Sequence, residues 1–151
     1  MASTPLHKSV TLRCDQAHAF RTWVERIDLW WPPGHRTRAG STMALEGHPG
    51  GHLVERGPDG ERFTFGQVRA WEPPTRMTLA WFPGTGERRP TEVEITFTAI
   101  EDGARTRVDV VHRVGAPLAE GEWPVKVKVF ERSWTHVLEA LREAIAREAS
   151  P

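Results

Sequence analysis

Residues 124–149 carry the sequence feature that most constrains how this chain can fold. Apolar residues recur there mostly at intervals of three and four, which places them on one stripe of a helix with charged residues opposite. The stripe consists of Val127, Phe130, Trp134, Val137, Leu138, Leu141 and Ile145. Such a helix would span about 40 Å, well beyond the ~13–15 Å radius of a domain of this size. It must therefore lie across the domain, and the rest of the chain has to supply a broad apolar surface beneath it.

The first turns of this segment also show a second periodicity. Three valines alternate with two lysines between Val125 and Val129, which is typical of a strand. Lysines in a first helical turn also oppose the helix dipole. From about Phe130 onward the periodicity indicates a helix alone, whereas the first turns before it are open to either structure and are expected to form or gate the mouth of a cavity.

Composition narrows the class of protein. The chain has 151 residues, and twenty basic residues balance twenty acidic ones, so it lacks the electrostatic footprint of a nucleic-acid-binding or membrane-surface protein. No apolar run approaches the ~20 residues of a membrane span, and Cys14 is the single cysteine, which suits a reducing compartment. We expect one cytoplasmic domain over residues 1–151, a monomer or weak dimer, with no nucleic acid, membrane or cofactor as a partner.

The N-terminal third predicts a strand followed by helices. Residues 7–14 alternate apolar and polar side chains, and Asp15 is a suitable N-cap for an amphipathic helix over residues 17–27. Trp30 and Trp31 come directly before two prolines, which end any helix. We interpret them as a short helical turn that places two indoles against the domain. Seven tryptophans and no tyrosine suit a roomy apolar interior.

Six further strands are expected between turns. They cover residues 42–46, 52–56, 61–71, 77–82, 91–99 and 105–114. The apolar phase breaks after Phe65, so Gly66 indicates a bulge. Short turns, two of them Asp-Gly, join successive strands, which indicates antiparallel pairing with one covered face. The predicted class is α+β: a curved antiparallel sheet of about six to seven strands that grips a long C-terminal helix, with one or two short helices after the first strand.

An ordered set of short motifs resembles one superfamily. They are Phe20-x-x-Trp23, Trp30-Trp31-Pro32, Gly50-Gly51, Asp59-Gly60, Gly66-x-Val68-x-x-Trp71-Glu72-Pro73-Pro74, Trp81, Thr91-Glu92-Val93, Asp102-Gly103, and Trp134 with Leu138 and Leu141. With this element order, the chain resembles the START-like (SRPBCC) helix-grip superfamily, in particular the branch of homologues of the activator of heat-shock-protein (Hsp90) ATPase. Ser133 departs from that branch, which often has glycine before the helix tryptophan. The resemblance implies a cavity for hydrophobic small molecules between sheet and helix, and no shared catalytic residues.

If there is a cavity, the residues that line it should come from the sheet face and the helix stripe that face each other. The expected ligand-binding residues are Trp31, Met77, Trp81, Ile95, Phe97, Val110, His112, Phe130 and Trp134. A curved sheet beneath a straight helix leaves space near one end, and apolar clefts are common ligand sites. The alternative is that the tryptophans fill this space as a solid core.

His112 is the polar residue with the clearest direction, because it is in phase with Val108 and Val110 and so points inward. It is a weak catalytic candidate that could orient a carbonyl or phenol or act as a base, with Glu55 as its partner if that strand faces inward. The alternative is a core histidine hydrogen-bonded to a backbone carbonyl, or one at the solvent edge of the strand. We place His136 on the surface, one position off the stripe.

Other polar groups favour structural interpretations. A metal site at Glu46, His48, His52 and Glu55 is disfavoured, because a Pro-Gly-Gly turn separates the histidines. The arginines at 36, 38, 56, 62, 88 and 89 are scattered among acids, and no Gly-rich loop stands between a strand and a helix. Cys14 suits a small buried apolar residue. We predict no metal site.

Three functions remain open. The first is binding of a small hydrophobic ligand in the cavity. The second is an interaction module for a chaperone ATPase, which would require an exposed apolar or charged patch on the outer sheet face. That face instead carries Glu92, Glu94, Thr96 and Thr98. The third is an enzyme of the cyclase or hydrolase kind found elsewhere in the superfamily, which requires a paired acid and base in the cavity.

Overall fold

The computed structural model describes residues 4–115 and 122–148, and its elements follow the predicted order. The helices are α1 (Gln16–Glu25), α2 (Ile27–Trp30) and α3 (Trp123–Glu148), with 3-10 turns η1 (Pro33–His35) and η2 (Glu101–Gly103). The strands are β1 (Leu6–Leu12), β2 (Thr42–Leu45), β3 (His52–Arg56), β4 (Arg62–Glu72), β5 (Arg76–Trp81), β6 (Thr91–Ile100) and β7 (Arg105–Arg113).

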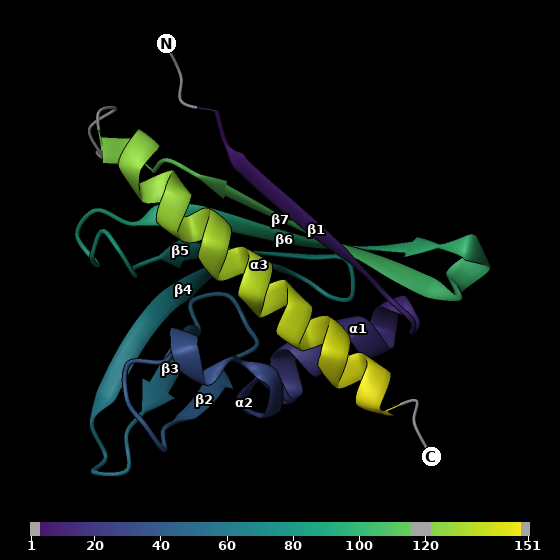
Figure 1. The fold of residues 1–151 in the computed structure, drawn as a ribbon, viewed down its shortest axis with the longest axis horizontal. Coiled ribbons are helices and arrows are strands. Elements are labelled where there is room, and N and C mark those ends of the chain that lie inside the picture. The colour runs from purple at the N-terminus through teal and green to yellow at the C-terminus, as the bar shows by residue number, and fades with distance from the viewer. Residues whose placement is uncertain (1–3, 116–121, 149–151) are drawn as a thin grey trace.

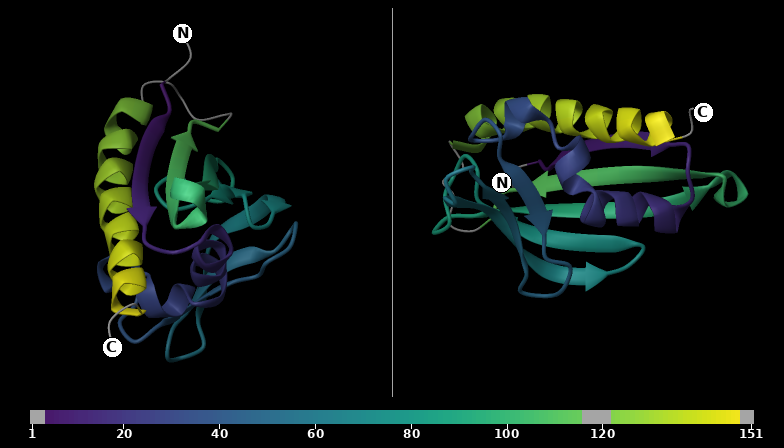
Figure 2. Two further views of the ribbon diagram at one scale, coloured as in Figure 1. Left: turned by 90° about the vertical axis from the view of Figure 1, so that its right-hand side faces the viewer. Right: turned by 90° about the horizontal axis from the view of Figure 1, so that it is seen from below.

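The seven strands form one antiparallel sheet in the order β1-β7-β6-β5-β4-β3-β2. The sheet curls, and α3 runs obliquely across its concave side next to β1 (Figure 1). The first two strands lie at opposite edges of the sheet, so α1, α2 and η1 bridge the open side between them (Figure 2). The predicted α+β helix-grip arrangement is therefore confirmed.

The N-terminal helices are fixed by a cap and by an indole hydrogen bond. The carboxylate of Asp15 accepts a hydrogen bond from the backbone N–H of His18 at 2.8 Å, as expected for an N-cap. The predicted helix over 17–27 divides at Arg26, and α2 begins at the next residue. The Trp30 indole donates to the Thr22 carbonyl at 3.0 Å, which holds α2 against α1.

The predicted bulge in β4 is confirmed. The pairing of β3 with β4 shifts register between Leu53 and Val54, opposite Gly66. A Cβ atom at Gly66 would lie 2.4 Å from the Ala80 carbonyl oxygen of β5, so only glycine permits this approach. The bulge explains why the apolar phase of β4 changes after Phe65.

The first turns of the C-terminal segment, whose periodicity also suggested a strand, are helical, because α3 begins at Trp123. The valines that suggested a strand are spaced as a helix requires: Val125 and Val129 lie one turn apart and are 68% and 59% exposed. The Trp123 side chain is buried, and its indole donates to the Thr4 carbonyl at 3.0 Å. This contact anchors the first turn, which local periodicity could not indicate. Within the described residues, no helix is long and apolar enough to cross a bilayer.

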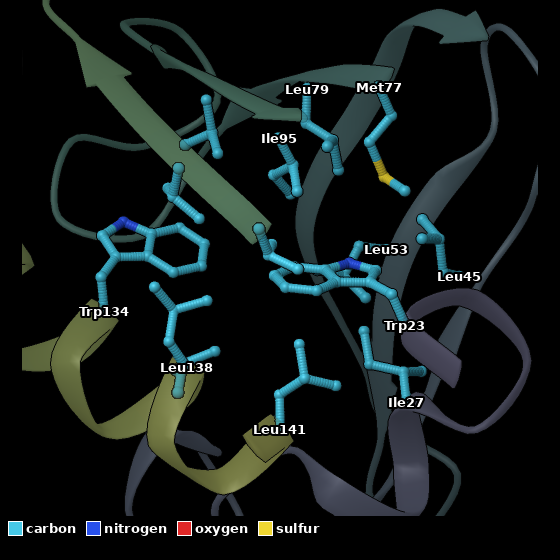
Figure 3. Close-up of a cluster of buried hydrophobic side chains, with 14 of the residues drawn as sticks. Trp23, Ile27, Leu45, Leu53, Met77, Leu79, Ile95, Trp134, Leu138 and Leu141 are labelled. Carbon is cyan, nitrogen blue, oxygen red and sulfur yellow. The ribbon is translucent and has the colours of Figure 1, made fainter. Parts of the chain in front are cut away.

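The predicted helix stripe is buried from Phe130 to Ile145, and Val127 is half-buried. Leu138 and Leu141 of α3 point toward Trp23 and Ile27 of the short helices and toward Met77 of β5 (Figure 3). All five side chains are at most 3% exposed, so this part of the interior is solid core. On the outer sheet face, the Glu94 carboxylate accepts hydrogen bonds from Arg76 at 2.6 Å and Arg113 at 3.0 Å.

Candidate ligand pocket

A pocket of about 150 Å³ lies beneath the first half of α3. Five aromatic rings surround it, one before η1, two on the sheet and two on the helix: Trp31, Phe65, Trp81, Phe130 and Trp134. Its remaining lining residues are His35, Pro83, Gly84, Val129, Ser133 and Val137. The exposed Val129 marks the side on which it opens to solvent. The lining is thus apolar and aromatic, with two polar side chains, His35 and Ser133, among the described residues.

Hydrogen bonds to its backbone and indole hold Trp31 at the edge of this pocket. Its indole N–H donates to the His35 carbonyl at 3.1 Å. Its own carbonyl accepts from the Arg36 guanidinium, whose charge is balanced by Asp28 at 2.9 Å. The ring therefore stands 6.3 Å from Trp134, nearly perpendicular to it.

The turn after β5 closes one end of the pocket and requires glycine. Gly84 has a φ of 88°, and an added Cβ would lie 3.1 Å from the Phe130 ring. With any other residue at position 84, the turn could not approach α3 this closely without strain.

His112 lies behind the pocket and takes part in a chain of hydrogen bonds. The Trp134 indole N–H donates to Nδ1 of His112 at 3.0 Å, so the ring proton resides on Nε2. Nε2 lies 2.6 Å from the Thr91 hydroxyl, and that hydroxyl lies 3.5 Å from the Trp81 carbonyl. Both ring nitrogens are therefore satisfied within the protein, and the chain joins α3 to β5, β6 and β7.

The His112 ring is held neutral. It is fully buried, and the Phe130 ring stacks against it with 4.1 Å between centroids. Burial without a compensating charge lowers its pKa from 6.5 to about 3. This geometry corresponds to the core-histidine interpretation, with side-chain partners rather than a backbone carbonyl.

Two histidines meet at the mouth of the pocket. Nε2 of His35, which lines the pocket, lies 3.2 Å from Nδ1 of His136 on α3. Burial, and then the neighbouring imidazole, lower the pKa of His35. His136 is exposed, as expected, but it is not isolated.

Glu55 is buried at 1% exposure, as an inward-facing strand would require, yet it is not a partner of His112. Its carboxylate accepts hydrogen bonds from the backbone of Thr37 and Arg38 and from the hydroxyls of Thr37 and Ser41, at 2.5–3.1 Å. Burial alone would raise its pKa, but these donors together lower it. Glu55 therefore anchors the loop between η1 and β2.

The remaining sequence candidates are dispersed. Glu46 accepts from the backbone N–H of His52 at 2.8 Å, and His48 turns toward the Pro49 carbonyl. Among the described residues, no three metal-ligating side chains converge. Cys14 is half-buried, and burial, then Asp15 and Glu148, raise the pKa of its thiol to about 11.

The pocket contains four of the nine expected ligand-binding residues: Trp31, Trp81, Phe130 and Trp134. The other five, Met77, Ile95, Phe97, Val110 and His112, are buried core residues outside its lining. Phe97, for example, packs 5.1 Å from Phe20 of α1. The reason is that α1 and α2 fill the middle of the concave face, whereas the pocket lies at the Trp81 end.

Sequence reasoning missed several lining residues. His35, Phe65, Pro83, Gly84, Val129 and Ser133 were not expected there. Phe65 could have been found, since it faces inward before the bulge. His35 could not, because its position depends on how η1 packs against a helix about a hundred residues away.

The curled sheet, the long helix across it and the pocket between them define a START-like (SRPBCC) helix-grip protein. A sequence model of the family described as "Activator of Hsp90 ATPase homolog 1-like protein" matches residues 14–146. The chain belongs to this family. A comparison with curated protein sequences found no relative.

Solved structures share this fold. A protein from Nitrosomonas europaea is 18% identical with a TM-score of 0.66, over 95% of each chain. A Mesorhizobium loti protein is 12% identical with a TM-score of 0.70, over 98% of this chain and all of the other. An anthrahydroquino-γ-pyrone synthase, Txn09, is 29% identical with a TM-score of 0.54, over 74% of this chain and 77% of its own.

Proposed function

We propose that the chain binds a small apolar molecule in the pocket beneath the first half of α3. The observation that carries this proposal is a pocket of about 150 Å³ that five aromatic rings line and that opens to solvent on one side. A dry cavity of about this volume holds a benzene-sized molecule. The preferred occupant is therefore one aromatic ring, or a larger molecule that inserts one ring and extends through the open side. Apolar burial supplies the affinity, at roughly 25 cal/mol per Å².

Polar groups at two depths orient such a ligand. His35 and Ser133 lie in the lining and can contact a ligand directly. The Ser133 hydroxyl donates to the Val129 carbonyl at 3.1 Å and so offers its lone pairs. His112 acts through the indole of Trp134, which makes it a positioning residue rather than a contact. The name of Txn09, a synthase for an aromatic product, supports an aromatic ligand class at 29% identity.

A pocket-filling variant tests the proposal. Ser133→Phe places a ring in the pocket from a half-buried helix position, and Ser133→Ala is the matched control. Isothermal titration with toluene, indole and naphthalene should show saturable binding for the wild type and Ser133→Ala, and the toluene titration should also change the tryptophan fluorescence. Binding by Ser133→Phe should be at least about tenfold weaker. Equal binding by both variants, or no saturable response to any compound, would refute the proposal.

A second candidate is an interaction module for a chaperone ATPase. Family membership favours it, as do Val125 and Val129, which are exposed one turn apart on α3. The outer sheet face, where a patch was expected, instead carries paired charges such as Glu94 with Arg76. The test is the ATPase rate of a purified Hsp90-type chaperone with and without the protein. Stimulation that Val125→Asp abolishes would support it, and no change in rate would contradict it.

A further inference from the structure

We propose that His35 and His136 form a binding site for a divalent first-row transition metal ion at the mouth of the pocket. The inference does not depend on the proposed ligand, because it rests on the two imidazoles alone. Neutral imidazole is a preferred ligand of Zn²⁺, Cu²⁺ and Ni²⁺.

The spacing of the two ring nitrogens fits one ion. Nε2 of His35 and Nδ1 of His136 are 3.2 Å apart. Two nitrogens that bind a tetrahedral ion at ~2.0–2.1 Å are separated by roughly 3.3 Å. For both facing nitrogens to bind the ion, the ring that donates in the hydrogen bond must carry its proton on its other nitrogen, so both imidazoles stay neutral and no net proton is lost. Each ring then turns so that its lone pair meets the metal. The exposed His136 side chain has the freedom to turn.

Each imidazole is mounted on a different, well-anchored element. His35 ends η1, where its backbone N–H donates to Pro32 at 3.0 Å and its carbonyl accepts from Trp31 at 3.1 Å. His136 lies in the middle of α3. An ion held by both links η1 to α3 across the edge of the pocket. Metal binding should therefore stabilise the folded protein by mass action.

The charged residues around the two imidazoles influence the affinity for the ion, and two imidazoles leave some of its coordination positions unfilled. Lys128, Glu131 and Arg132 line the surface groove next to His136, and this net positive charge opposes cation binding. Among the described residues, no carboxylate, thiol or further imidazole converges to give a third ligand. Water or a donor atom of a pocket ligand must complete the coordination. Affinity should then follow the order Cu²⁺ above Ni²⁺ and Zn²⁺.

Isothermal titration of the untagged protein with Cu²⁺, Ni²⁺ and Zn²⁺ tests the site. The wild type should bind one ion, and His136→Ala and His35→Ala should each bind at least about tenfold more weakly. His18→Ala is the matched control, since His18 pairs with Glu148 at 2.5 Å near the far end of α3. This variant should keep the wild-type affinity.

Two further measurements separate the site from diffuse binding and from unfolding. Imidazole ¹⁵N shifts should change at Nε2 of His35 and Nδ1 of His136 on addition of Zn²⁺. Zn²⁺ should also raise the Tm of the wild type and His18→Ala but not that of His136→Ala, whose exposed position makes misfolding a poor explanation. Equal weakening by His18→Ala and His136→Ala, or ¹⁵N changes confined to other histidines, would overturn the proposal.

Discussion

The two halves of α3 cover interiors of different kinds. The second half, with Leu138 and Leu141, meets Trp23, Ile27 and Met77 in a solid apolar core (Figure 3). The first half covers the aromatic pocket and the buried hydrogen-bond chain through His112. In the second half, α1 and α2 fill the space between the helix and the sheet, whereas in the first half a gap lined by large rings remains between α3 and the curved sheet. The same apolar stripe therefore packs in the core at one end and lines the pocket of the proposed ligand site at the other.

The hydrogen-bond chain explains why the rings at the first half do not collapse into the gap. The indole of Trp134 is tied to His112, and the indole and carbonyl of Trp31 are tied to η1 and Arg36. Each of these two indoles therefore has a polar edge that fixes its orientation, while its faces line the pocket. Trp23, in the solid half, is positioned by packing.

The largest expected contrast between the halves is in cavity-forming substitutions. Leu141→Ala removes a fully buried side chain from the solid half and should lower the free energy of unfolding by about 3 kcal/mol. Phe130→Ala removes a larger side chain but should cost no more, because the ring already borders open space. Urea unfolding of both variants measures the difference. A clearly greater loss for Phe130→Ala would show that the pocket end is packed as tightly as the core.

The next contrast is in acid sensitivity, which should arise at the pocket end. Burial lowers the pKa of His112 from 6.5 to about 3, so below pH 6.5 the unfolded chain binds a proton that the folded protein does not. Stability should therefore be greatest above pH 6.5 and fall by roughly 1.4 kcal/mol per pH unit toward pH 3. From about pH 7 to about pH 5 the loss should reach about 2 kcal/mol.

His112→Gln supplies the control, since an amide does not titrate in this range. Urea unfolding at a series of pH values should show that the unfolding free energy of the variant falls less steeply with decreasing pH, by roughly 1.4 kcal/mol per pH unit. Parallel slopes for the two proteins would mean that the ring is already protonated, or solvated, in the folded state. Glu55, whose pKa is lowered below 4.5, adds acid sensitivity in both proteins only at lower pH.

Sequence periodicity was sufficient to predict the buried residues of the solid half, but it was insufficient to predict the contacts that build the pocket half. The stripe residues from Trp134 to Ile145 and the inward direction of His112 follow from local repeats of three, four and two, which are preserved on folding. The start of α3 depends on the Trp123–Thr4 contact between residues 119 positions apart, and the His35–His136 pair spans 101. Such contacts leave no local pattern. Glu55 was considered as a catalytic partner of His112 for the same reason. Its hydrogen-bond donors lie in the loop between η1 and β2, which its own strand does not indicate.

The smallest expected contrast is between two tryptophans, one from each half. Trp134→Phe removes the indole donor to Nδ1 of His112, whereas Trp23→Phe removes a similar volume from the solid core. Beyond the packing loss that the two share, Trp134→Phe should cost about 1 kcal/mol for the hydrogen bond, because it leaves a buried acceptor unpaired. It should also allow the His112 proton to move to Nδ1, since the indole N–H is what keeps that proton on Nε2. Imidazole ¹⁵N shifts of His112 report that change directly. An unchanged tautomer, with the two variants equally stable, would show that ring packing alone holds the pocket open.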